Sequence, residues 1–331
     1  MTKRPESELT NMKNLVITFS DIYLNWQLGA GHPTNPVRAK LATEMLVERL
    51  KERATVIDPA PREQRSNDIA ILNELHDPHY VAEHIAGNNS GLWGGNQPDV
   101  AEAGLAMFEG TVRAVELILS GEAQVVFNPQ GAKHHAKYGH GAGFCAFNDM
   151  AYAAIALKRA GLKVLYIDWD IHAGDGVFHM LKGHGIPTIS IHNGSTFPVD
   201  REMQCLDGSR TDVIDEVNLG YNFNVRSGDG DDYFMEAIDK ARAIIDAYQP
   251  DVILLAAGAD GHTGANNLGV DSNYTAKGFK YAAEMVAEMA NKHSQGRVII
   301  GGAGGYQPFK ETPETWALVV STIYDNVTKG A

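Results

Sequence analysis

Two carboxylates and an imidazole follow a strongly apolar run in VLYIDWDIHAGDG, residues 164–176. In an extended chain, residues two apart point to the same side, so Asp168, Asp170 and His172 would face one cavity. Burying an unpaired carboxylate is very costly, and a cation is the natural partner of such a trio. Alternatively, Asp170 could cap a helix that begins near Gly174, and Asp168 could cap it or support the site from behind.

A further acid ends another apolar run, in LLAAGADGH at 254–262, where glycines bracket Asp260. Together, Asp170, His172 and Asp260 would supply three protein ligands and leave a position open for water and substrate, as catalytic metal sites do. A set rich in oxygen ligands suits Zn²⁺ and also Fe²⁺, Co²⁺ or Mn²⁺. The sequence thus predicts a catalytic site for one divalent metal ion without choosing the metal.

Two further stretches carry groups that could act beside a metal ion. In NPQGAKHHAKYGHGAGFCAFND, residues 128–149, the adjacent His134 and His135 could transfer protons near a metal-activated water. In VIIGGAGGYQP, residues 298–308, the glycines allow a sharp turn that could aim the Tyr306 hydroxyl into the cavity. A plain glycine turn with a packing tyrosine is the alternative. Four other histidines lack comparable context and are predicted to be surface or structural residues: His140, His179, His184 and His262.

The elements that would position these residues are short β-branched runs, each followed by a helical stretch. The runs cover 15–19, 54–59, 123–128, 162–168, 186–192, 251–258 and 297–302. Several are apolar almost throughout, as strands buried on both faces must be. We therefore expect an α/β fold with a mostly parallel central β-sheet of about eight strands, flanked by helices on both faces. Apolar residues at helical spacing predict an amphipathic helix from Tyr233 to Tyr248.

Glycine-rich stretches follow several of these runs, and open α/β sheets bind their ligands at the carboxyl ends of strands. No repeat or linker divides the chain, so residues 1–331 are predicted to form a single catalytic domain, with 1–13 as a flexible N-terminal segment. The stretch 88–98, NNSGLWGGNQP, carries Trp93, which we expect to be exposed. It could be a lid over the site, a contact between subunits or a plain surface loop.

The amino-acid composition limits the classes of partner that the protein could bind. The formal charge of −13 argues against nucleic acid, which proteins bind through basic patches. The charge would suit a cationic substrate, or it could serve only solubility. Two cysteines are too few for a disulfide framework, and no apolar run reaches the length of about 18 residues that indicates a membrane span. We expect a cytoplasmic protein that binds neither nucleic acid nor membrane, and the sequence leaves a homo-oligomer open.

Taken in order along the chain, these motifs resemble those of the histone deacetylase and acetylpolyamine amidohydrolase family, which has the arginase-deacetylase fold. The resemblance spans nearly the whole chain. Besides the stretches above, it includes GHPTNPVRA (31–39), LHDPHYV (75–81), ISIHNGSTFP (189–198) and NVRSGDGDDYF (224–234). It implies a zinc-dependent amidohydrolase that removes the acetyl group from an acetylpolyamine, another small acetylated amine or acetyl-lysine.

The resemblance also implies roles for individual residues. The family's zinc ligands match Asp170, His172 and Asp260. Its general base, which later acts as the acid, matches His135, and the electrostatic companion of that base matches His134.

Three further residues match the family's catalytic machinery. Asp168 and Asp175 match the acids that orient His134 and His135 respectively. Tyr306 matches the tyrosine that polarises the amide carbonyl.

For the substrate tunnel, the resemblance implies aromatic walls at Phe144 and Phe197, with Gly143 lining the space between them. Because GANNLG replaces the family's usual stretch after the last zinc ligand, the residue at the tunnel mouth is expected to be Asn266 or Asn267. A structural potassium ion would be bound by the backbone of Asp168, Asp170 and His172 together with Ser190 and Ile191.

Two departures from the family's motifs bear on the identity of the substrate. Ala173 replaces the second histidine of a common pair, and Pro78 replaces an aspartate that grips peptide backbone in eukaryotic lysine deacetylases.

Two other functions are alternatives to deacetylation. An arginase-like ureohydrolase would need more aspartates interleaved with histidines for its paired manganese ions. An inactive metal-binding sensor would be favoured by loss of His135 or Tyr306, and both are present.

Overall fold

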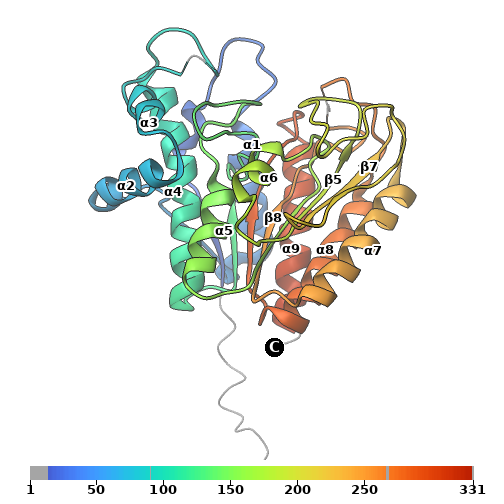
Figure 1. The fold of residues 1–331 in the computed structure, drawn as a ribbon. Coiled ribbons are helices and arrows are strands. Elements are labelled where there is room, and N and C mark those ends of the chain that lie inside the picture. The colour runs from blue at the N-terminus through green and yellow to red at the C-terminus, as the bar shows by residue number, and fades with distance from the viewer. Residues whose placement is uncertain (1–13, 90, 266–267, 330–331) are drawn as a thin grey trace, which may run out of the picture.

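The computed structural model describes residues 14–89, 91–265 and 268–329. Within these residues, one sheet of nine strands runs in the order β2-β1-β3-β9-β8-β4-β5-β7-β6 (Figure 1). Neighbouring strands are parallel except for β6 and β7. The strands are β1 Leu15–Thr18, β2 Ala54–Ile57, β3 Val125–Asn128, β4 Val164–Asp168, β5 Thr188–Asn193, β6 Val213–Asp215, β7 Gly220–Val225, β8 Val252–Ala256 and β9 Val298–Gly301.

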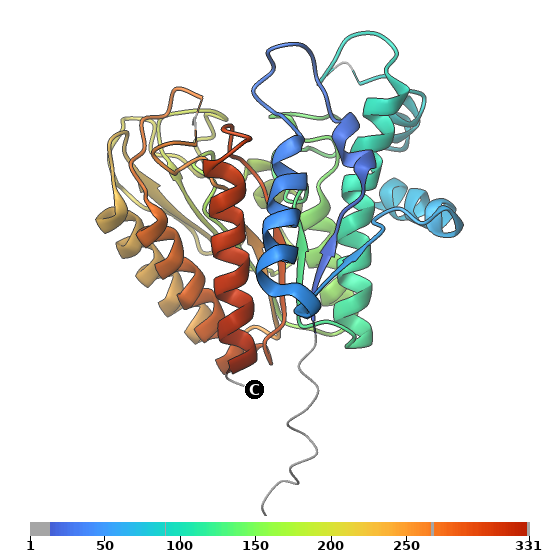
Figure 2. The ribbon, with the colours of Figure 1, turned by 180° about the vertical axis from the view of Figure 1, so that it is seen from behind.

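Helices cover both faces of the sheet. α1, α7, α8 and α9 lie on one face (Figure 2), whereas α4 and α5 lie on the other (Figure 1). The helices are α1 Val37–Leu50, α2 Arg65–Leu75, α3 Pro78–Ile85, α4 Pro98–Ser120, α5 Asp149–Arg159, α6 Asp175–Leu181, α7 Asp231–Tyr248, α8 Ala276–His293 and α9 Glu311–Lys329. Among these described helices, none combines the length and the apolar character that crossing a membrane requires.

The strand side chains alternate between two cores. Leu165 and Ile167 of β4 join the core under α7, α8 and α9, whereas Val164 and Tyr166 join the core under α4 and α5. Both faces of the sheet are therefore buried under helices, which explains why the strand runs are apolar at nearly every position. Each of the seven predicted runs overlaps a strand, and the predicted amphipathic helix is α7.

Four adjacent strands in the middle of the sheet carry the stretches that the sequence singles out. β3, β9, β8 and β4 are neighbours, and the chain leaves each of them at the same edge of the sheet. This arrangement brings together the four loops that begin after Asn128, Asp168, Ala256 and Gly301. The parallel order thus supplies the convergence that a single site requires.

Trp93 is buried, so the expectation that it is exposed is wrong. Only 7% of the residue is accessible, its ring lies 5.9 Å from that of Trp26, and its indole N–H donates to the Gly87 carbonyl over 3.1 Å. The reason is that α2 and α3 pack beside α4, outside the sheet, and form a third core with Trp93. The predicted flexible segment 1–13 lies outside the described residues.

Candidate active site

Asp170, His172 and Asp260 converge at the edge of the sheet where β4 and β8 end. His172 Nδ1 lies 2.9 Å from Asp260 Oδ2 and 3.2 Å from Asp170 Oδ1, although His172 and Asp260 are 88 residues apart in the sequence. One ligand atom from each of the three residues lies within 4.8 Å of the others, and all three side chains are buried. Two carboxylates and an imidazole in this arrangement form a candidate site for a divalent metal ion.

Backbone N–H groups orient both carboxylates. Gly304 donates to Asp170 Oδ2 over 2.6 Å, and Ile171 donates to Asp260 Oδ1 over 3.0 Å. Gly304 also has no room for a side chain, because an added Cβ would lie 2.4 Å from Asp260 Oδ2 and 2.5 Å from Asp170 Oδ2. A glycine after β9 is therefore required for the backbone to approach the two acids this closely.

The three groups are strongly coupled. Burial, together with the neighbouring Asp170, raises the pKa of Asp260 to about 6. Burial lowers the pKa of His172, but its hydrogen bonds to the two carboxylates outweigh burial and raise that pKa to about 10. Burial likewise acts to raise the pKa of Asp170, yet His134 and His172 hold it below its usual range. A proton on His172 offsets the paired acids, and a bound metal ion would have to displace it.

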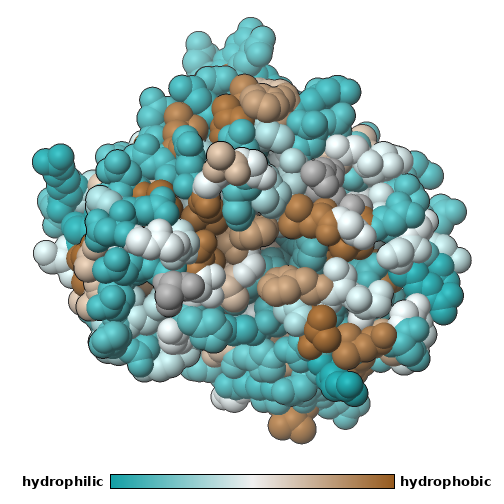
Figure 3. Space-filling model, turned by 90° about the horizontal axis from the view of Figure 1, so that it is seen from above, coloured by the Kyte–Doolittle hydropathy of each residue, from teal (hydrophilic) through white to brown (hydrophobic). Residues whose placement is uncertain are grey.

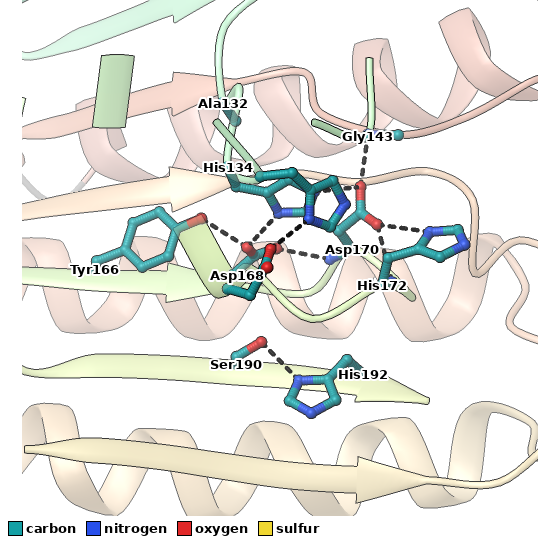
Figure 4. A network of polar contacts seen from close by, with 12 residues as sticks. Ala132, His134, Gly143, Tyr166, Asp168, Asp170, His172, Ser190 and His192 are labelled. Carbon is teal, nitrogen blue, oxygen red and sulfur yellow. Dashed lines mark hydrogen bonds and ion pairs between the residues drawn. The ribbon is translucent and has the colours of Figure 1, made fainter. Parts of the chain in front are cut away.

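His134 is held by Asp168 (Figure 4). Its Nδ1 lies 2.7 Å from Asp168 Oδ2, which also accepts a 2.6 Å hydrogen bond from the Tyr166 hydroxyl. The backbone N–H of Asp170 donates to the other oxygen of Asp168 over 2.9 Å. Burial lowers the pKa of His134, but the charges of Asp168 and Asp170 outweigh it and raise the pKa to about 9.

His135 is held by Asp175, the first residue of α6. Its Nδ1 lies 2.8 Å from Asp175 Oδ1, and the Lys137 ammonium group contacts the second carboxylate oxygen. Because an ionised carboxylate can only accept, Nδ1 carries the proton and Nε2 remains an acceptor. Burial and the neighbouring His134 lower the pKa of His135 to about 4. The adjacent histidines thus differ in protonation, with His134 a cation and His135 a neutral base at pH 7.

A cavity of about 260 Å³ leads to these residues. Seen from the edge where the strands end, the surface is hollowed near its centre, and hydrophobic residues gather around the hollow (Figure 3). The Phe197 ring lies 4.9 Å from that of His135, and the Phe144 ring lies 6.2 Å from that of Tyr306. The lining consists of His135, Gly143, Phe144, His172, Thr196, Phe197, Leu268 and Tyr306.

Gly143 lies against the base. Its φ is +52°, and an added Cβ would lie 2.3 Å from His135 Cδ2. Position 143 therefore needs glycine both for its backbone conformation and for the space that His135 occupies.

Sequence reasoning missed several residues around the site. Thr196 and Leu268 line the cavity, and Lys137 is a second partner of Asp175. Lys137 follows the histidine pair by two residues, so a partner for a nearby acid could have been sought there. The predicted tunnel-mouth residues Asn266 and Asn267 lie outside the described residues.

The residues predicted to surround a potassium ion are neighbours in the sheet. Ser190 of β5 is the register partner of Asp168 in β4, and the Ser190 hydroxyl lies 2.7 Å from His192 Nδ1 (Figure 4). Ile191 is the next residue of β5 and is buried. The ion itself stays a prediction.

The four histidines without sequence context lie apart from this group. His140 and His184 are exposed, His179 contacts Asp200 over 2.5 Å, and His262 accepts a hydrogen bond from the Gly264 backbone.

Comparisons with known proteins agree with the geometry. Residues 32–323 match the sequence profile of the histone deacetylase domain. The acetoin utilization protein AcuC of Bacillus subtilis is 28% identical over 93% of this chain and 81% of its own length. A probable deacetylase of Archaeoglobus fulgidus is 27% identical over 90% of this chain and 83% of its own length. The crystal structure of the HDA15 HD domain superposes with a TM-score of 0.77 at 22% identity, over 95% of this chain and 89% of that one.

Proposed function

This chain belongs to the histone deacetylase family, and from that premise we propose that it is a zinc-dependent deacetylase of acetylated alkylamines. The family relationship makes it a hydrolase of amides. The observation that carries the finer proposal is the convergence of Asp170, His172 and Asp260 beside two adjacent histidines and a tyrosine.

The three ligands fit one zinc ion. Asp170 and Asp260 each have an oxygen held by a backbone N–H, which fixes the carboxylates while leaving their other oxygens near His172 Nδ1. Bound zinc lowers the pKa of a coordinated water and polarises the acetyl carbonyl. Fe²⁺, Co²⁺ and Mn²⁺ accept the same ligands, so the protein purified from its own cells could carry one of them.

His135 is the general base of this proposal. Its neutral ring, with Nδ1–H directed to Asp175, presents Nε2 as the acceptor for a proton from the attacking water. The same nitrogen then returns the proton to the leaving amine. Asp175 stabilises the imidazolium that exists between these two transfers. His135 and Lys137 outweigh the effect of burial on Asp175 and lower its pKa to about 2, so this acid stays ionised.

Tyr306 supplies a hydrogen bond to the developing oxyanion. Burial and the nearby Asp260 and Asp170 raise the pKa of its hydroxyl well above the usual value, so the tyrosine keeps its proton throughout. A donor that is already in place when negative charge forms on the carbonyl oxygen contributes strongly to the rate. His134, kept as a cation by Asp168, adds positive charge next to the base.

The cavity favours a neutral alkyl arm. In the described part of its lining, aromatic and aliphatic groups surround the histidines and Tyr306, and no carboxylate is present. A polyamine needs an acid near the tunnel mouth for its second ammonium group. An acetyl-lysine side chain or another acetylated monoamine therefore suits the cavity better than an acetylpolyamine.

Acetate release from acetyl-lysine peptides and acetylpolyamines, measured on the zinc-loaded enzyme, tests this proposal. We expect turnover of the acetyl-lysine peptides, at least about a hundredfold less with His135→Ala and about tenfold to a hundredfold less with Tyr306→Phe. If the folded, zinc-loaded protein releases no acetate from any of these amides, the result would support an inactive metal-binding sensor instead. Faster turnover of acetylpolyamines than of acetyl-lysine would reject the substrate class.

A further inference from the structure

A second cavity adjoins the candidate active site. Gly143, Phe144 and Tyr306 line both cavities, and the second is also lined by His134 and Asp170. It measures about 20 Å³, which is room for one or two water molecules and thus for a group the size of a carboxylate. The remaining lining includes Thr34, Arg38 and Lys133.

Arg38 and Lys133 are both buried, with 3% and 6% of each residue accessible. The Lys133 ammonium group lies 5.7 Å from the centre of the Trp26 ring, and its one hydrogen bond, to Gln130 Oε1, is 3.5 Å long. The Arg38 guanidinium donates to the Gly305 carbonyl and stacks on Trp316, 5.0 Å from the ring centre. Among the residues that the structure describes, neither cation forms an ion pair with a carboxylate.

Further donors around this cavity lack acceptors. Arg38 Nε and Thr34 Oγ1 are buried without a hydrogen-bond partner in the described structure. Two acids whose charges act on these cations accept hydrogen bonds from other groups. Asp149 accepts from the backbone of Ala132 and Lys133, and Asp170 accepts from Gly304.

Two neighbouring cations that form no ion pair with a carboxylate are costly in a protein interior, although Asp170 also lines this cavity. Burial lowers the pKa of Lys133 to about 8. Cys145 and Asp149 oppose this shift, whereas the charge of Arg38 acts in the same direction as burial. Unpartnered donors and excess positive charge in a cavity of this size match the chemistry of a bound carboxylate.

Because this cavity borders the place where the acyl group would lie, we propose that it binds the terminal carboxylate of a short dicarboxylic acyl group. The enzyme then hydrolyses malonyl-type and succinyl-type amides of lysine as well as acetyl amides. Water adds to the amide carbonyl carbon and the C–N bond breaks. The products are the free dicarboxylate, which keeps the water oxygen, and the amine, which takes both protons of the water and leaves as an ammonium ion. This inference rests on the proposed amide hydrolysis and adds an acyl specificity to it.

Substitution of Lys133 tests the proposed acyl specificity. On one zinc-loaded enzyme and one peptide sequence, kcat/KM is measured for acetyl-, propionyl-, malonyl- and succinyl-lysine. We expect Lys133→Met to lower the ratio of malonyl or succinyl turnover to propionyl turnover at least about tenfold, the effect of losing one charge-assisted hydrogen bond. Lys133→Arg should restore the ratio. Lys158→Met, at an exposed lysine, is the matched control that should leave it unchanged.

Several results would overturn the inference. One is hydrolysis of acetyl-lysine and propionyl-lysine with no turnover of either dicarboxylic acyl group. Another is an equal fall for all four acyl groups in Lys133→Met, which would give Lys133 a structural role. Weaker inhibition by free acetate in Lys133→Met, without dicarboxylic turnover, would show that the cavity holds the released product only. If the enzyme hydrolyses malonyl-lysine but not acetyl-lysine, the result would instead contradict the proposed deacetylase activity and leave the dicarboxylic acyl specificity standing.

Discussion

His134 and His135 show how neighbouring residues of one type acquire different chemistry. Each histidine donates from Nδ1 to its own carboxylate, Asp168 or Asp175. His134 also interacts with the charge of Asp170, whose Oδ2 lies 3.9 Å from His134 Nε2. The pKa of His134 therefore rises to about 9, while burial and the neighbouring His134 lower the pKa of His135 to about 4. The sequence predicted the pair and the family resemblance its roles, but the difference in protonation depends on distances that no pattern contains.

Asp175→Asn should slow the chemical step. The amide would no longer stabilise a protonated His135, and it could present its N–H₂ group and favour the wrong tautomer. We expect kcat to fall about tenfold to a hundredfold, with the zinc content unchanged. Steady-state kinetics with metal analysis checks this, and Asp207→Asn, at an exposed acid, is the control. Loss of zinc from Asp175→Asn would mean that the acid supports the metal site instead.

Gly304→Ala should abolish metal binding. The added methyl group would fall within 2.5 Å of a carboxylate oxygen from both Asp170 and Asp260, so one acid must move. Elemental analysis after dialysis against zinc should find much less than one ion per chain. Gly94→Ala, where an added Cβ meets nothing within 4 Å, should keep its zinc. A fully loaded Gly304→Ala protein would show that these acids are not the ligands.

At the scale of elements, the sheet from β2 to β5 was predictable, whereas β7 and β6 at its other edge were not. β4 and β8 are apolar because both of their faces are buried. β7 was missed because Asn222 and Asn224 interrupt its apolar pattern. Their amide groups donate to backbone carbonyls of Val213 and Thr211, contacts that only the fold reveals.

Burial outside the sheet was also beyond sequence reasoning. Trp93 is covered because α2 and α3 dock on α4, and a glycine-rich stretch gives no sign of that docking. Arg38 and Lys133 share a cavity although 31–39 and 128–149 are distant stretches, and nothing in either stretch links them.

His76 joins α2 and α3 to the loop that carries His134 and His135, and it makes this junction sensitive to acid. Its Nδ1 donates to the Lys137 carbonyl over 2.9 Å, and its Nε2 accepts from the Asn148 backbone over 3.0 Å. Burial lowers its pKa to about 4. The unfolded chain takes up this proton near pH 6.5, so stability is present above that pH and is lost as the pH falls towards 4.

Urea unfolding between pH 7 and 4.5 measures this effect. We expect the free energy of unfolding to fall by about 2–3 kcal/mol through His76. His76→Asn should be less stable at pH 7 and should lose less on acidification. Parallel pH profiles for the two proteins would contradict the assignment.

At the scale of the whole molecule, the formal charge of −13 is the property whose purpose the sequence left open. If the charge attracts cationic substrates, kcat/KM for a lysine-rich acetylated peptide should fall several-fold between about 50 and 500 mM salt. A neutral acetylated peptide of equal length should change little. Equal salt dependence for the two peptides would leave solubility as the role of the charge.

The central layers of the fold follow from the alternation of apolar runs and helices, and the site follows from the order of the strands. β3, β9, β8 and β4 are neighbours in the sheet although they are far apart in the sequence. Sequence motifs could name the residues that follow these strands, but only the strand order brings their side chains together at one edge of the sheet.

Zinc titration of the metal-free protein, followed by acetate release from an acetyl-lysine peptide, tests the central claim most directly. Activity should be absent without metal, rise linearly to one equivalent of zinc per chain and then level off. Asp260→Ala should stay inactive over the same range. Full turnover by the metal-free protein, or by Asp260→Ala at one equivalent, would contradict the claim that Asp170, His172 and Asp260 hold the catalytic ion.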